Sequence, residues 1–211
     1  AISLVVVAPV SGNYSVTSIP HTPSAAPLTQ SAPALGDEGT QSVALPFTFN
    51  FGGVNYTDVT IHANGQILMG ANNLSAQFAY TPPTVFDAAA PNNWVGFWGD
   101  LNNSVASSIT YDIVGSAPNR KLVVKFNAVD FWQFDPGVTY QIELNETSNT
   151  VDVFLTSVNT ISLNARAVGL ETSTQGWAAP GYNTGTWTAT NQAFRFAPIQ
   201  AATIQWSGQG I

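Results

Sequence analysis

The sequence contains no cysteine and few charged residues. None of its 211 residues is Cys, which excludes a disulfide framework and any thiolate metal site. Charged residues make up 8% of the chain and hydrophobic residues 45%, a composition that excludes an intrinsically disordered chain. The 5 basic and 12 acidic residues give a net charge of −7. A phosphate backbone would be repelled by this charge, so nucleic acid is not an expected partner.

No stretch of the sequence is long enough to cross a membrane as a helix. The longest apolar run, Ile2 to Val10, is interrupted by Ser3 and Pro9 and is far shorter than the roughly 20 residues that a span needs. No basic leader precedes this run and no Met precedes Ala1, so we expect a targeting segment to have been removed already. We therefore predict an extracellular or cell-surface location and no transmembrane segment.

Short runs of β-branched and aromatic residues, separated by Gly, Pro, Asn and Ser, predict strands. Val43–Phe51 alternates apolar and polar residues, as a half-buried strand does. Asn64-Gly65 is a strong hairpin signal, because both residues tolerate a positive φ. Trp94–Trp98 is nearly apolar throughout, which indicates a central strand covered on both faces. The pattern predicts an all-β fold with little or no helix, a two-sheet antiparallel β-sandwich of jelly-roll-like type.

Several segments follow one another in an order that is typical of one kind of domain. They are Leu45–Gly53, Asn64–Gly70, Phe97–Leu101, Leu122–Phe126 and Val168–Glu171. This pattern resembles the nidogen-type (NIDO) extracellular domain and that of secreted bacterial surface proteins. The resemblance implies a β-sandwich carried on exported, surface-attached or matrix proteins, and it brings no catalytic motif. Where the pattern has an acidic pair after the tryptophan, this sequence has Gly99-Asp100.

Two groups of aromatic residues are candidates for binding a surface polysaccharide, since ring faces stack on the apolar faces of sugars. The candidates are Phe131, Trp132, Phe134, Trp177 and Trp187. The alternative, which we favour, is that these rings line the core of the sandwich, where each buries a large area.

Asp100 and Asn102 are the candidate metal ligands. They lie beside Asn103 and Ser104, and calcium takes oxygen ligands of these kinds. The alternative is a solvated turn that is held by Asx hydrogen bonds. Apart from calcium we predict no cofactor, because two histidines without cysteine do not suggest a zinc site.

Three carboxylates are the candidates that a hydrolase built on a sandwich would use: Asp130, Asp135 and Glu143. A glycosidase needs two carboxylates about 5–10 Å apart, and nothing in the sequence pairs any two of these. The sequence also has no Gly-x-Ser-x-Gly elbow and no glycine loop for phosphate. We therefore predict that the protein is not an enzyme.

The N-terminal run is uncharged and rich in valine, and it suits a strand that is buried on both faces. Its candidate assembly residues are Ile2, Leu4, Val5, Val6 and Val7. The run either closes the domain's own sandwich or is donated to a neighbouring sheet, and the C-terminal run 201–206 allows the same two interpretations. Donation from head to tail does not close on itself, so it produces filaments.

These observations together predict one domain over residues 1–211, with residues 1–12 as an exchanged or donor strand. Its predicted function is that of a non-enzymatic extracellular structural or adhesive module. The expected partner is another copy of the chain, in an oligomer or surface filament. The alternative function is a carbohydrate-binding module that uses exposed aromatic residues.

Overall fold

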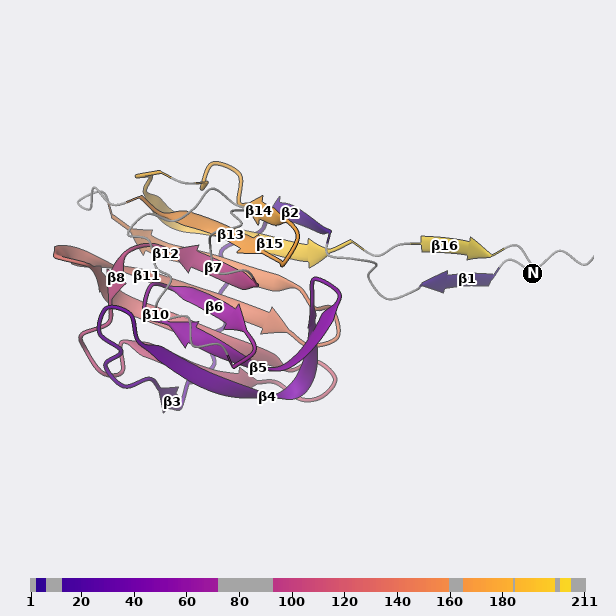
Figure 1. Ribbon diagram of the computed structural model, residues 1–211, viewed down its shortest axis with the longest axis horizontal. Helices are drawn as coiled ribbons and strands as arrows, with labels where there is room; N and C mark the ends of the chain where they lie inside the picture. The colour runs from indigo at the N-terminus through magenta and orange to yellow at the C-terminus, as the bar shows by residue number, and fades with distance from the viewer. Residues whose placement is uncertain are drawn as a thin grey trace, which may run out of the picture.

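The computed structural model describes residues 3–6, 13–71, 93–159, 165–183, 185–199 and 202–205, with the backbone alone for residues 3–6, 134–136 and 202–205. In these ranges the chain forms sixteen strands. Most belong to two antiparallel sheets that pack face to face (Figure 1). This confirms the predicted all-β sandwich. The described residues include no helix that is long and apolar enough to cross a membrane.

The larger sheet has eight strands in the order β2-β15-β12-β11-β10-β9-β3, and β8 also pairs with β10. The bounds are β2 (Tyr14–Ser18), β3 (Gln30–Ser31), β8 (Leu101–Asn102), β9 (Ile109–Val114), β10 (Lys121–Phe131), β11 (Phe134–Asn145), β12 (Val151–Val158) and β15 (Ala189–Pro198). The hairpin of β10 and β11 forms its centre, with Val124 opposite both Tyr111 and Ile142.

The smaller sheet has six strands in the order β14-β13-β7-β6-β5-β4. The bounds are β4 (Thr40–Phe51), β5 (Val54–His62), β6 (Gln66–Met69), β7 (Trp94–Trp98), β13 (Ala167–Glu171) and β14 (Gly176–Ala178). The long strand β4 is an edge of this sheet, with β5 as its partner, and it exposes Pro46 to solvent. The register of β4 against β5 shifts between Ala44 and Phe49.

The strands and the hairpin that the local sequence patterns predicted are present in the structure. In β4 the apolar residues of the alternation are buried and the residues Ala44, Pro46 and Thr48 between them are exposed. At the Asn64-Gly65 hairpin, Gly65 has a φ of +102° and its N–H donates to the carbonyl of His62. The strand Trp94–Trp98 is buried on both faces, as predicted.

An aromatic stack joins the two sheets across the core. The ring of Tyr140 on β11 stacks on Phe126 at a centroid distance of 4.5 Å and on Phe97 of β7 at 4.9 Å. The Tyr140 hydroxyl donates a hydrogen bond of 3.1 Å to the carbonyl of Gly65. Tyr140 therefore holds the β5–β6 turn of one sheet against the centre of the other.

At Gly96 in β7 the two sheets are in close contact. Gly96 has a φ of +119°, and a Cβ atom added there would lie 2.3 Å from Cδ1 of Ile142. Only glycine fits this position, because the backbone conformation is left-handed and the space is already filled.

The terminal strands form a small sheet of their own. β1 (Ser3–Val6) pairs antiparallel with β16 (Ala202–Gln205), with Leu4 opposite Ile204. Figure 1 shows this pair extending beyond one end of the sandwich. Of the predicted assembly residues, Leu4, Val5 and Val6 lie in β1, and Ile2 and Val7 lie outside the described residues. The role of β1 in assembly stays a prediction.

Candidate functional site

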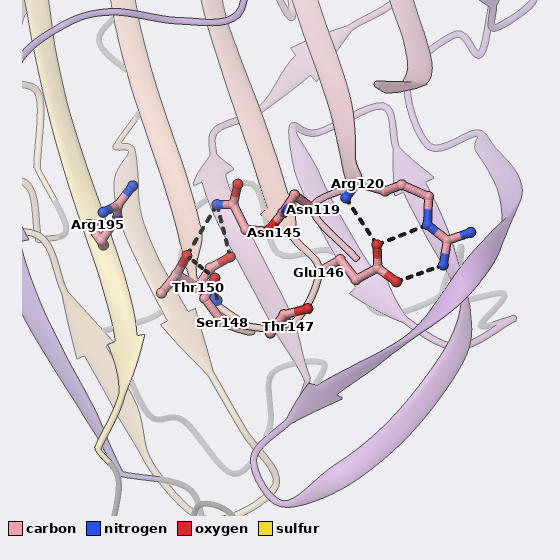
Figure 2. Close-up of a pocket in the computed structure, with 8 residues that line it drawn as sticks. All are labelled: Asn119, Arg120, Asn145, Glu146, Thr147, Ser148, Thr150 and Arg195. Atoms are coloured by element: carbon pink, nitrogen blue, oxygen red, sulfur yellow. Dashed lines mark hydrogen bonds and ion pairs between the residues drawn. The ribbon is translucent and has the colours of Figure 1, made fainter. Parts of the chain in front are cut away.

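A polar pocket of about 330 Å³ opens where the end of β11 and the turn that follows it meet the start of β10 (Figure 2). The residues that line it carry amides, hydroxyls, one carboxylate and two guanidinium groups: Asn119, Arg120, Asn145, Glu146, Thr147, Ser148, Thr150 and Arg195. Its volume falls within the range of small-molecule sites, which is about 300–1,000 Å³. None of the site residues predicted from the sequence lies in this pocket.

An ion pair forms one wall of the pocket. Both Nε and a terminal nitrogen of Arg120 donate to the carboxylate of Glu146, at 2.8 and 2.6 Å, and the Arg120 N–H also donates to it at 2.9 Å. These hydrogen bonds lower the pKa of Glu146 to about 2. Glu146 is therefore ionised and already satisfied, which suits a structural role better than proton transfer.

The opposite wall is held in a similar way. Arg195 makes two hydrogen bonds to Asp152, at 2.6 and 2.7 Å, and the side-chain amide of Asn145 donates to Asp152 at 3.2 Å and to Thr150 Oγ1 at 3.1 Å. Rigid amide and hydroxyl groups between two fixed ion pairs can hold a polar ligand by hydrogen bonds. The sequence signal for this pocket is the polar turn 145–150, which separates two long strands.

A second polar cluster lies where three loops meet, and it contains acids that sequence reasoning missed. The amide of Asn64 donates to Glu38 at 3.1 Å and its carbonyl oxygen accepts from the Leu101 N–H at 2.8 Å. Asp37 and Asp100 each raise the pKa of Glu38 by repulsion, after burial, which contributes most. The pKa values rise to about 7 for Glu38 and to about 6 for Asp100.

The nearby histidine is neutral at physiological pH. His62 is fully buried, and burial lowers its pKa to about 4. Its Nδ1 accepts a hydrogen bond of 3.0 Å from the Asn64 N–H. His62 Nε2 lies 3.9 Å from the carboxylate of Glu38. Because the imidazole is uncharged near neutral pH, the two side chains do not form an ion pair there.

We expect Glu38 to make the domain less stable as the pH rises. Its pKa is about 7 in the folded state and 4.5 ordinarily, so the folded protein binds more protons between these values. The stability from this proton is fully present below about pH 4.5 and is lost as the pH rises through 7. Glu38→Gln should therefore raise the free energy of unfolding by about 1–2 kcal/mol more at pH 8 than at pH 5, after discounting for partial exposure.

Urea unfolding of both proteins at the two pH values measures this difference. Glu146→Gln is the matched control with the opposite sign, since the pKa of Glu146 is lowered and its removal should destabilise the protein at pH 8. An equal effect of Glu38→Gln at both pH values would contradict the prediction.

The two predicted calcium ligands lie on either side of Leu101, and the structure gives them different neighbours. Asp100 is buried beside Glu38 and Asp37, whereas Asn102 lies in β8, opposite Asp130. Among the described residues, no group of three or more His, Cys, Asp or Glu side chains is placed to hold a metal ion. Calcium at this position stays a prediction.

The structure packs most of the predicted sugar-stacking rings against the core. Phe131 is buried, and Trp177 and Trp187 pack against the core cluster, with Trp177 at 5.3 Å from the ring of Tyr14. Trp132 is half-buried in the β10–β11 turn, and the side chain of Phe134 lies outside the described residues. Phe131 is thus part of the core, and Trp177 and Trp187 are partly buried against it; sugar binding by these rings stays a prediction.

Two of the candidate hydrolase carboxylates, Glu143 and Asp130, lie far apart in the sheet. Glu143 is opposite Val123, and Asp130 lies seven positions further along β10 (130 − 123), which is roughly 20 Å along a strand. Glu143 is ion-paired with Lys121 and also accepts a hydrogen bond from the Ser24 N–H at 2.7 Å. Glu143 and Asp130 do not form the pair, about 5–10 Å apart, that glycoside hydrolysis needs. The side chain of Asp135 lies outside the described residues.

Comparison with known proteins shows the family. A search of curated proteins and a search of solved structures found no significant match. A family model described as NIDO related matches residues 12–207. This range spans most of the chain and includes every strand of the two main sheets. The resemblance to a nidogen-type domain is thereby confirmed, and the chain belongs to the NIDO-related family.

Proposed function

We propose that this domain is a non-enzymatic structural or adhesive module that joins copies of itself through strands at its termini. NIDO-like domains are extracellular, which gives the compartment in which such a module would work. The observation that carries the proposal is the separate two-stranded sheet of β1 and β16. This sheet is the part of the described chain that pairs with neither main sheet.

A two-stranded sheet is marginally stable on its own in water, because it buries little apolar surface. Neither Ser3–Val6 nor Ala202–Gln205 contains a charged residue or a proline. Charges and prolines are the features that normally protect an edge strand from pairing with another chain. The terminal sheet is therefore suited to gaining further strands from another molecule.

Exchange of β1 between copies is the form of such pairing that needs no new register. If β1 of one copy pairs with β16 of the next, the pairing of Leu4 with Ile204 is kept and the copies join head to tail. Such an arrangement continues unless a rotation closes it into a ring. The low charge content of 8% reduces the repulsion between packed copies.

Val5→Pro is expected to abolish self-association. Val5 pairs with Thr203 in the terminal sheet, and proline lacks the N–H that strand pairing uses. Light scattering coupled to size-exclusion chromatography, together with electron microscopy, should show oligomers or fibres for the unmodified chain and monomers for the variant. Val105→Pro is the control, because Val105 is 62% exposed and lies outside the strands. An unmodified chain that stays monomeric at high concentration would contradict the proposal.

Carbohydrate binding is the second candidate, and the polar pocket of Figure 2 is the observation that favours it. Amides and hydroxyls such as those of Asn119, Asn145 and Thr147 match the hydroxyl groups of a sugar. A glycan array probed with the Val5→Pro monomer separates the two functions. Specific binding by this monomer would favour the carbohydrate module, and no binding would favour the structural one.

A further inference from the structure

Arg166 is a fully buried arginine whose backbone is held firmly in place. It forms a bridge with Gly185, in which the Arg166 N–H donates at 2.8 Å and its carbonyl accepts at 3.1 Å. The indole N–H of Trp187 donates to the same carbonyl at 3.0 Å. These hydrogen bonds fix the position of the Arg166 backbone, and with it the base of its side chain, immediately before β13.

Contacts with neighbouring groups also orient the guanidinium. Its Nε donates to the carbonyl of Trp187 at 2.7 Å. Its central carbon lies 5.1 Å from the ring centroid of Phe131 and 5.7 Å from that of Trp187, distances at which a cation is attracted to an aromatic ring. These contacts use Nε and the faces of the guanidinium. The two terminal nitrogens are therefore the part of the group that can bind another partner.

Those two nitrogens, Nη1 and Nη2, are buried and have no hydrogen-bond partner among the residues that the structure describes. The ion pairs found among the described residues engage Arg120, Lys121 and Arg195 with acids, and none of them includes Arg166. An arginine does not escape this situation by losing its proton, since its pKa stays too high. Burial lowers the pKa of Arg166, as expected for a charge without compensation. Buried charges in proteins are normally paired.

We propose that Arg166, with the rings of Phe131 and Trp187 around it, is a binding site for a small carboxylate. The planar guanidinium presents parallel N–H groups, which match the two oxygens of a carboxylate. A single negative charge neutralises the single positive charge of Arg166. Burial of the two nitrogens favours a small ion over a bulky one. The site is independent of strand exchange, and it uses two of the rings that the sequence suggested for ligand binding.

Thermal unfolding of the intact domain in increasing acetate tests this site, with ionic strength held constant by sodium chloride. We expect a saturable rise in the melting temperature of the unmodified protein, as for any ligand that binds only the folded state. The rise should be absent in Arg166→Met and should need at least tenfold more acetate in Arg166→Lys, which lacks the paired donors. Arg195→Met, which removes an exposed and paired arginine, should keep the response.

Arg166→Met should also melt at a higher temperature than the unmodified protein in the absence of carboxylate, since an apolar residue of similar size replaces a buried charge.

Saturation-transfer NMR on the unmodified protein gives a second measurement that does not depend on a variant folding. The acetate methyl protons should receive saturation from the protein, and formate should compete for the site. Glucuronate in place of acetate tests the size limit of the site. We expect a response to acetate and formate alone, and an equal response to glucuronate would contradict a site for small carboxylates. An equal response in Arg166→Met, or none in the unmodified protein by either method, overturns the proposal.

Discussion

Replacing Tyr140 with alanine is expected to lower the free energy of unfolding by about 3–5 kcal/mol, the cost of removing a large ring from a packed core. Tyr140 is fully buried and stacks on Phe126 and Phe97 at 4.5 and 4.9 Å. Removal of the ring leaves a cavity between the sheets and leaves the carbonyl of Gly65 without its hydroxyl donor. Urea denaturation with an unchanged m-value would measure the loss.

Tyr140→Phe separates the ring from the hydroxyl. It keeps the stack and removes only the hydrogen bond to Gly65, so it should cost about 1–2 kcal/mol. A surface change such as Val54→Ala, at a side chain that is 51% exposed, should stay within about 0.5 kcal/mol. If Tyr140→Ala destabilised no more than Tyr140→Phe, the stack would not be the main contact between the sheets.

The second large effect is expected at Gly96, where Gly96→Ala should cost about 2–4 kcal/mol by combining backbone strain with overpacking. The φ of +119° disfavours any residue with a Cβ atom. The new methyl group would also lie 2.3 Å from Cδ1 of Ile142, so the Ile142 side chain must change its rotamer in the packed core or β7 and β11 must move apart. Chemical denaturation measures the loss of stability.

Gly181→Ala is the matched control for the backbone contribution. Gly181 also has a positive φ, +81°, but no atom lies within 4 Å of the position that a Cβ would occupy. This control should lose about 1 kcal/mol, from strain alone. Equal losses at both glycines would mean that the contact with Ile142 adds nothing.

Local periodicity explains why much of the fold could be predicted from the sequence. The alternation in Val43–Phe51 and the turn chemistry of Asn64-Gly65 involve neighbouring residues, and each specifies a strand or a hairpin without reference to the rest of the chain. Trp94–Trp98 indicated burial on both faces for the same reason. The structure places Val95 and Phe97 in the main core and the two tryptophans with Leu68 in a second cluster.

The candidate sites depend on contacts that periodicity does not describe. Residues 131–134 lie at the tight β10–β11 turn, with Phe131 opposite Phe134, so the run of aromatics lies in a turn in which Phe131 is anchored in the core. Glu38, Asn64 and Asp100 meet only because three loops end at the same place. The unpaired edge of Arg166 likewise results from tertiary packing, since no neighbour in sequence reveals it.

The proline on β4 affects how copies of the domain can meet. β4 is a long strand at the edge of its sheet, and Pro46 faces solvent in its middle. A chain approaching this side finds one backbone donor missing and the ladder interrupted, so sideways growth of the sheet into an amyloid-like stack is hindered. Copies of a chain with so few charged residues are therefore hindered from pairing with one another along this edge.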